Sequence, residues 1–255
     1  WLVEGDAAFE PESRRPRSSP NRTPPDVAAR ILQLRDQLTA EGHDAGADTI
    51  QELLGRGGIT VSRATIWRLL KANGKIVPQP QKRPRSSWQR FAADRPNELW
   101  QSDFTHVLLT TGVDVEVIGW IDDHSRCLLH LTAHPRVTGR IVIDTFTSAA
   151  TEHGYPTATL TDNGMVYTTR YARNARGIAP GNGFETLLAL QGIVQKNGLP
   201  FKPTTQGKIE RFSQTLKRHL AAHPAATIDD LQRTLDTFRD YYNQQRPHRS
   251  LSRRT

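Results

Sequence analysis

The chain has 255 residues, and 36% of them are hydrophobic, which is enough to fill one large domain or two modest ones and argues against a wholly disordered chain. Its net charge of +8 favours a polyanionic partner over a small neutral substrate, with nucleic acid ahead of an anionic membrane. The sequence has no long apolar run and no signal-peptide pattern, which excludes a membrane span. It has a single cysteine, which excludes a disulfide framework and favours a reducing cytoplasm.

Residues 1–25 include the stretch EPESRRPRSSPNRTPP, whose Pro, Ser and Arg content predicts a linker or the remnant of an upstream segment. The chain begins at Trp1 without an initiator methionine and stops in the basic stretch RPHRSLSRRT. We therefore expect it to be part of a longer polypeptide.

Residues 26–76 carry the pattern of a small helical domain. Apolar residues recur at helical spacing at its start, a second short helix is predicted around Thr49 to Leu54, and a third lies in SRATIWRLLKANG. In the third helix Ser62 is the predicted cap, and Gly74 marks the end. Three short helices with the turn GRGGIT before the last one predict a helix-turn-helix domain.

The third helix is the predicted recognition helix, which would enter a major groove of DNA. The side chains expected to point outward from it are Arg63, Thr65, Arg68 and Lys71. A solvated polar face on an ordinary small helical domain is the alternative, because helix-turn-helix signals are weak in a single sequence. The basic segments on both sides favour DNA binding.

A second basic, proline-rich linker is predicted over residues 77–97, and beyond it the pattern changes to strands. The stretches LWQSDFTHVLL, DVEVIGWIDD and RCLLHLTA follow one another closely enough to predict an antiparallel meander. The elements expected next are a helix in VTGRIVIDTFTSAATEHG, a short buried strand ending at Asp162, a helix from about Phe184, a strand in GIVQKNG, and helices from Gln206 to Ala222 and Thr227 to Gln244. This order predicts an α/β domain with a mixed sheet over residues 98–255.

Three acidic residues stand out in this layout. Asp103 lies within the first strand, Asp162 ends the fourth, and Glu210 lies in the first turns of the penultimate helix. A carboxylate flanked by apolar strand residues is costly to bury unless a positive group meets it, and a divalent cation is the candidate. Mg²⁺ prefers carboxylate and water oxygens, and a pair of such ions can act on a phosphodiester.

The helix that carries Glu210 has a narrow apolar stripe, which is expected to face the core. The stripe consists of Ile209, Phe212, Leu216 and Leu220. Glu210, Gln214 and Lys217 fall on the adjoining stripe, at the edge of the buried face. That position suits a metal ligand with a cation two turns further on that grips a phosphate.

Each acid also has a structural interpretation. An isolated glutamate on a helix is usually solvated, and Asp162 followed by Asn163 and Gly164 is an ordinary turn signature. Asp103 alone is compatible with a polar residue at a strand edge. Asp122 and Asp123 precede HSR at a strand-to-strand turn, where we favour a structural role. The conjunction of the three acids in separate elements carries the metal hypothesis.

The motifs WQSDFTH, IDDHSR, LTDNGM, QGKIERFSQTLKRHL and YYNQQRPHRSL resemble the catalytic core of bacterial insertion-sequence transposases related to retroviral integrases. These DDE enzymes have a ribonuclease-H-like fold, so the resemblance implies a mixed five-stranded sheet with flanking helices, preceded here by the small all-α helix-turn-helix domain. In that fold the first and fourth strands are neighbours, which would bring Asp103 and Asp162 together.

The resemblance also implies chemistry. Asp103, Asp162 and Glu210 would be the catalytic and metal-binding triad for Mg²⁺ or Mn²⁺, with two ions, and Lys217 the lysine that meets DNA near the cleaved end. We expect Lys208 and Arg211 to neutralise phosphates as well, and His106 and Asn163 to support the acids from a second layer. The implied reaction is cleavage of element ends and strand transfer on double-stranded DNA, by a homo-oligomer in the bacterial cytoplasm at the nucleoid.

One departure from the family pattern is the longer interval between Asp162 and Glu210. We place the excess in the loop from Tyr171 to Gly183, whose flanking and internal arginines are expected to touch DNA. Two rival functions stay open: a helix-turn-helix regulator with an inactive core, and a ribonuclease-H-like nuclease without strand transfer. No GxGxxG after a strand, GxxxxGK[ST] or GxSxG motif favours another enzyme class.

Overall fold

The computed structural model describes residues 22–76, 92–170, 181–198, 207–248 and 251. Most of the predicted linkers and of the loop from Tyr171 to Gly183 lie outside these ranges. The elements in chain order are α1 (Pro25–Ala40), α2 (Ala47–Arg56), α3 (Arg63–Ala72), β1 (Leu99–Leu108), β2 (Asp114–Asp122), β3 (Leu128–His134), α4 (Gly139–His153), β4 (Ala158–Thr161), α5 (Gly183–Leu190), β5 (Val194–Asn197), α6 (Gly207–Ala222) and α7 (Ile228–Gln244).

The five strands form one mixed sheet in the order β3-β2-β1-β4-β5. β1 to β3 pair antiparallel, as a meander, whereas β4 pairs parallel with both β1 and β5. The predicted meander and the predicted contact between the first and fourth strands are therefore both confirmed. The ribonuclease-H-like fold class, a mixed five-stranded sheet with flanking helices, is confirmed as well.

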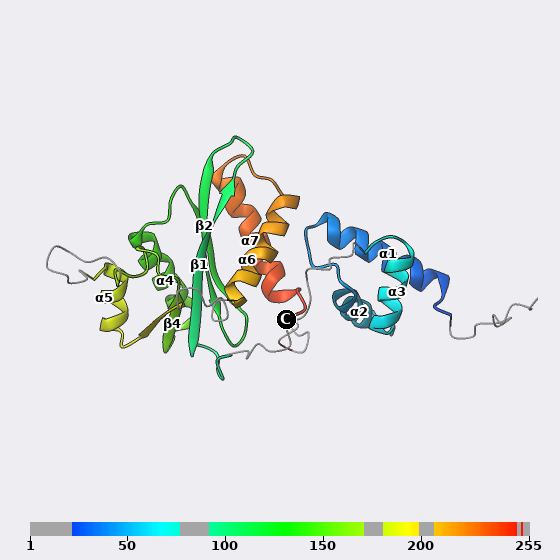
Figure 1. The fold of residues 1–255 in the computed structure, drawn as a ribbon, viewed down its shortest axis with the longest axis horizontal. Coiled ribbons are helices and arrows are strands. Elements are labelled where there is room, and N and C mark those ends of the chain that lie inside the picture. The colour runs from blue at the N-terminus through cyan, green and yellow to red at the C-terminus, as the bar shows by residue number, and fades with distance from the viewer. Residues whose placement is uncertain (1–21, 77–91, 171–180, 199–206, 249–250, 252–255) are drawn as a thin grey trace, which may run out of the picture.

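Helices cover both faces of the sheet (Figure 1). On one face, α4 and α5 pack over a cluster rich in aromatic side chains, which includes Trp100, Trp120 and Phe146. On the other face, α6 and α7 pack over an aliphatic and aromatic cluster that includes Val117 and Phe212. Because side chains alternate along β1, its even-numbered residues face α4 and its odd-numbered residues face α6.

The helices α1 to α3 form a separate unit with its own core of buried aliphatic side chains. Ile66 and Leu70 of α3 are buried in it, and the Ser62 hydroxyl caps α3 by accepting a hydrogen bond from the Thr65 amide at 3.1 Å. The small all-α domain predicted before the sheet is thus present. None of the helices within the described ranges is long and apolar enough to cross a membrane.

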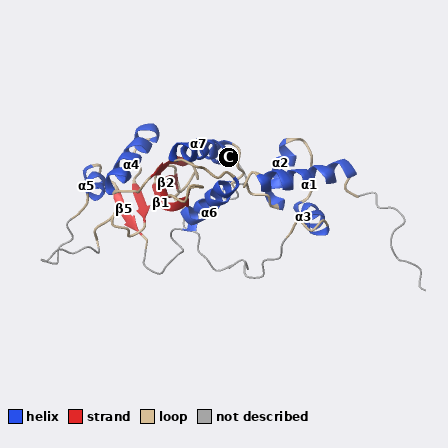
Figure 2. Cartoon of the chain, turned by 90° about the horizontal axis from the view of Figure 1, so that it is seen from above, coloured by secondary structure: helices blue, strands red, loops and turns tan. Residues whose placement is uncertain are grey.

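The turn between α1 and α2 joins the helical unit to α6 and α7 (Figures 1 and 2). Asp44 accepts hydrogen bonds from Arg218 of α6 at 2.5 Å and from Arg246 at 2.7 Å. The ring of His43 stacks on Tyr241 with the ring centroids 3.5 Å apart. Gly42 has a φ of +68°, and a Cβ atom there would lie 2.6 Å from the Arg218 carbonyl oxygen. The two units are therefore in close backbone contact.

We predict that Gly42→Ala separates the helical unit from the core. Alanine at positive φ costs about 1 kcal/mol of strain, and the contact with α6 adds roughly 1 to 3 kcal/mol. The matched control is Gly58→Ala, since Gly58 has a φ of +79° but open space around its Cβ position. Small-angle X-ray scattering should give a larger radius of gyration for Gly42→Ala alone. An equal change in both variants, or in neither, contradicts the prediction.

Candidate active site

The pairing of β1 with β4 places two of the predicted acids side by side. The parallel register joins Leu99 to Ala158 and Gln101 to Leu160, so two residues further on Asp103 comes level with Asp162. Opposite Asp103 on the other neighbouring strand is Gly119, where an added Cβ would lie 3.3 Å from the Phe212 ring of α6. Both acids thus lie toward the face of the sheet that α6 covers.

Helix α6 brings the third acid to the same face. Its predicted apolar stripe is buried as expected, at Ile209, Phe212, Leu216 and Leu220. Glu210 and Lys217 lie outside that stripe and are exposed. The buried stripe fixes the rotation of the helix about its axis, so it also fixes the direction of these two exposed side chains.

Electrostatics show that the acids and Lys217 share one environment. The pKa of Asp103 is raised to about 6, first because the carboxyl group is buried and next because of the negative charge of Asp162. Glu210 raises it further, whereas the Phe104 backbone N–H and the Lys217 ammonium lower it. The structure therefore brings Asp162, Glu210 and Lys217 within electrostatic range of Asp103.

The loop after β4 holds Asp162 in a tight turn. The Asp162 carboxylate accepts a hydrogen bond from the Gly164 amide at 2.9 Å, as the turn signature predicts. The amide group of Asn197 on β5 donates to the Asp162 backbone carbonyl at 3.2 Å. Asn163 donates to the Gly198 carbonyl at 2.9 Å, and its own side-chain oxygen is buried with no hydrogen-bond partner.

The structure differs from one sequence-based prediction about this site, the support of the acids by His106. His106 lies on the opposite face of β1 from Asp103, where its ring contacts Asp114 at 2.8 Å and Glu116 at 3.7 Å. The structure therefore does not bring His106 to the acids. Among the described residues, no group of three or more His, Cys, Asp or Glu side chains has the arrangement of a metal site as it stands.

Asp122 and Asp123 form a buried network that sequence reasoning treated only as a turn. The Asp122 carboxylate accepts hydrogen bonds from the Ser125 amide at 2.6 Å and the Asn97 amide at 2.8 Å. Asp123 is fully buried and accepts from Lys208, which was expected to contact phosphates. The motif IDDHSR carries the only sequence signal of this network, two adjacent acids at the end of a buried strand.

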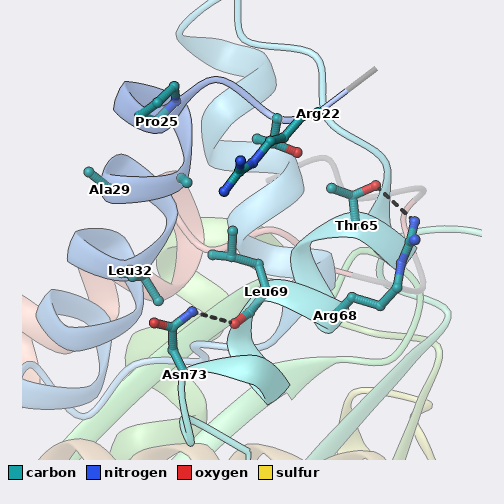
Figure 3. Close-up of a pocket in the computed structure, with 10 residues that line it drawn as sticks. Arg22, Pro25, Ala29, Leu32, Thr65, Arg68, Leu69 and Asn73 are labelled. Atoms are coloured by element: carbon teal, nitrogen blue, oxygen red, sulfur yellow. Dashed lines mark hydrogen bonds between the residues drawn. The ribbon is translucent and has the colours of Figure 1, made fainter. Parts of the chain in front are cut away.

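The predicted recognition helix is largely exposed, with Arg63, Arg68 and Lys71 on its surface. Arg63 pairs with Asp48 of α2 at 3.1 Å, and Lys71 lies 5.2 Å from the centre of the Trp67 ring. Figure 3 shows Arg68 beside Thr65, with a hydrogen bond of 3.3 Å between them, next to a pocket of about 670 Å³ between α1 and α3.

Family models match nearly the whole chain. A model described as an integrase core domain matches residues 93–208, and a second one of the same description matches residues 191–255. A model described as a homeodomain-like domain matches residues 1–70 and so begins before the boundary expected at residue 26.

Curated relatives are proteins of insertion elements. The chain is 27% identical over 230 residues to an uncharacterised 31.7 kDa protein of insertion element IS407 from Burkholderia multivorans, covering 89% of this chain and 77% of the relative. It is also 27% identical over 234 residues to an uncharacterised 39.2 kDa protein of insertion element IS476 from Xanthomonas euvesicatoria. That alignment covers 90% of this chain but only 64% of the relative.

Among solved structures, the chain is similar to an integrase catalytic core of HTLV-2 in complex with magnesium, at 20% identity and a TM-score of 0.46, covering 63% of this chain and 93% of that one. A simian T-cell lymphotropic virus intasome matches at 23% identity and a TM-score of 0.49, covering 75% of this chain and 63% of that one. The family models, with the sheet and the helical unit described above, show that the chain belongs to the integrase core family, with a homeodomain-like domain before the core, and the chain is similar to proteins of insertion elements.

Proposed function

We propose that this chain is the catalytic part of a transposase that cuts the ends of its element and joins the freed ends to target DNA. The observation that carries the proposal is the shared environment of Asp103, Asp162 and Glu210, in which burial first, and then the negative charges of Asp162 and Glu210, raise the pKa of Asp103 to about 6. Clustered carboxylates that raise one another's pKa values are common at functional sites. The basic net charge supports DNA as the substrate.

The donor set fits a hard divalent cation such as Mg²⁺ or Mn²⁺. Asp103, Asp162 and Glu210 would hold it, because they offer carboxylate oxygens and an excess of negative charge that a cation relieves. Two such ions held by these residues would supply activation of an attacking hydroxyl group and stabilisation of charge on a phosphodiester. Asp162 is held for this task by the Gly164 amide and Asn197, whereas Glu210 has an exposed side chain in the first turn of α6.

The remaining residues of the proposed site bind and orient DNA. Lys217, two turns beyond Glu210, would hold a phosphate beside the acids, and the exposed Arg211 would hold a second one. On α3, Arg68 and Lys71 with Arg63 and Thr65 would contact the major groove. Asn163, with its unpartnered side-chain oxygen beside Asp162, is proposed to support the acids. A homo-oligomer that joins two element ends completes the proposal.

We predict that Glu210→Gln abolishes metal-dependent cleavage of labelled element-end DNA while DNA binding persists. The substitution keeps the size of the side chain but removes the charge that a cation needs. Wild-type protein should cut the DNA in Mg²⁺ or Mn²⁺ and join the freed 3′ ends to a target, and the variant should lose at least about a hundredfold in rate, or ~3 kcal/mol of transition-state stabilisation. Gel electrophoresis separates cut from joined products.

The same assay distinguishes the rival functions. Cutting without joining by the wild type favours a nuclease, and DNA binding without any cutting favours a regulator with an inactive core. Equal cleavage by wild type and Glu210→Gln contradicts the role of Glu210. The exposed Glu152, on the far helix α4, supplies the matched control Glu152→Gln, which should cut like the wild type.

We further predict that Asp103→Asn stabilises the metal-free protein at pH 8. A pKa raised from 3.8 to about 6 means that the folded state holds this proton more tightly than the unfolded state does. The resulting stabilisation is complete below pH 4 and is lost as the pH rises through 6, so the ionised carboxylate costs roughly 3 kcal/mol at pH 8. Chemical denaturation in EDTA should show this gain for Asp103→Asn, and the gain should shrink toward pH 4.

The control for that measurement is Asp94→Asn, because Asp94 is exposed and lies outside the acidic cluster. A loss of stability in Asp103→Asn at pH 8, or a gain that does not depend on pH, contradicts the expected cost of ionising the buried Asp103. Added Mn²⁺ should stabilise the wild type and leave Asp103→Asn nearly unchanged.

A further inference from the structure

A fully buried carboxylate, Asp123, lies behind the acidic cluster at the end of β2. One of its oxygens accepts a hydrogen bond from the Gln101 side chain at 2.5 Å, and the other accepts from the Ala93 amide at 2.7 Å and from the Lys208 ammonium. Arg126 lies 3.8 Å away and donates to the Asp123 carbonyl at 2.5 Å. A buried charge this well satisfied is expensive to disturb, so it fixes the groups around it.

The two side chains that Asp123 holds come from the two elements that carry acids of the proposed site. Gln101 precedes Asp103 by two residues on β1 and lies on the same face of the strand. Lys208 precedes Glu210 by two residues in the first turn of α6. The Asp123 carboxylate therefore links β1, which carries Asp103, to the start of α6, which carries Glu210.

The first turn of α6 is the part of the site that most needs such an anchor. Glu210 is exposed there, and the apolar stripe of α6 begins at the neighbouring Ile209. The Lys208 ammonium donates to both the carboxylate and the backbone carbonyl of Asp123, so it points into the core and away from Glu210. A phosphate contact by Lys208 would require these bonds to break.

We propose that Asp123 and Lys208 are positioning residues that hold Glu210 at the distance from Asp103 at which both can bind one metal site. This inference rests on the proposed function for its chemistry. It assigns Lys208 to the protein interior, and it leaves the phosphate contacts of this helix to Arg211 and Lys217.

The test compares Lys208→Met, which keeps the aliphatic stem, with Lys208→Arg, which keeps the charge. Calorimetric titration of the whole chain with Mn²⁺, without DNA, should show affinity reduced at least tenfold in Lys208→Met and largely retained in Lys208→Arg. The rate of element-end cleavage at saturating DNA should fall in parallel. The dissociation constant for DNA and its dependence on salt concentration should stay at the wild-type values, whereas Lys217→Met should flatten the salt dependence.

Two further variants guard against misfolding and nonspecific charge effects. Asp123→Asn combined with Lys208→Met removes both charges of the buried pair, so it should fold, and it should bind Mn²⁺ as weakly as Lys208→Met. Arg140→Met, which removes an exposed ion pair with Asp144 on α4, should bind Mn²⁺ like the wild type. Each variant is checked by thermal unfolding before titration.

The outcomes separate this inference from the proposed function. Weaker DNA binding with a flatter salt dependence and normal Mn²⁺ affinity in Lys208→Met would identify a phosphate contact and overturn the inference. Wild-type Mn²⁺ affinity and cleavage in the double variant would overturn it as well, while leaving the function intact. A wild type that binds Mn²⁺ but cuts no DNA would refute the function, and a loss of Mn²⁺ affinity in Lys208→Met would still support the inference.

Discussion

The parallel pairing of β1 with β4 is the constraint on which the site depends. It brings Asp103 level with Asp162 in the middle of a sheet, where water is scarce and like charges repel. Folding tolerates this repulsion because the aromatic cluster under one face and the α6–α7 cluster on the other supply the burial that holds the strands together. The fold thus keeps Asp103 in a position where its ionised form is unfavourable, and under the proposed function a divalent cation would relieve that cost.

Helix α6 satisfies several requirements at once. Its apolar stripe covers one face of the sheet, its first turn carries Glu210, and its middle carries Lys217. Its Arg218 contacts the helical unit through Asp44. A helix with so many fixed contacts has little freedom to rotate, since a turn about its axis would expose Phe212 and move Glu210 together. Precision at the site therefore comes from packing at residues that touch no substrate.

The sequence predicted the helices and strands well because their signals are local. Helical spacing in α6 and the cap at Ser62 each depend on neighbours in the chain, and the structure agrees with both. The motif resemblance supplied the pairing of the first and fourth strands, which no local pattern contains. Contacts set by the tertiary fold could not be predicted from the sequence. Examples are the contacts of Lys208 with Asp123 and of His106 with Asp114. The neighbouring residues in the sequence do not reveal whether a lysine near a proposed catalytic acid faces solvent or a buried carboxylate.

The glycine contact between the helical unit and α6 has a consequence for how DNA would be handled. Arg218, which meets Gly42 and Asp44, lies eight residues beyond Glu210 on one continuous helix, or about 12 Å along its axis. The helix is unbroken between those two points, so this segment fixes the position of the helical unit relative to Glu210. Under the proposed function, DNA bound by both units of one chain would meet two sites whose separation this contact holds constant.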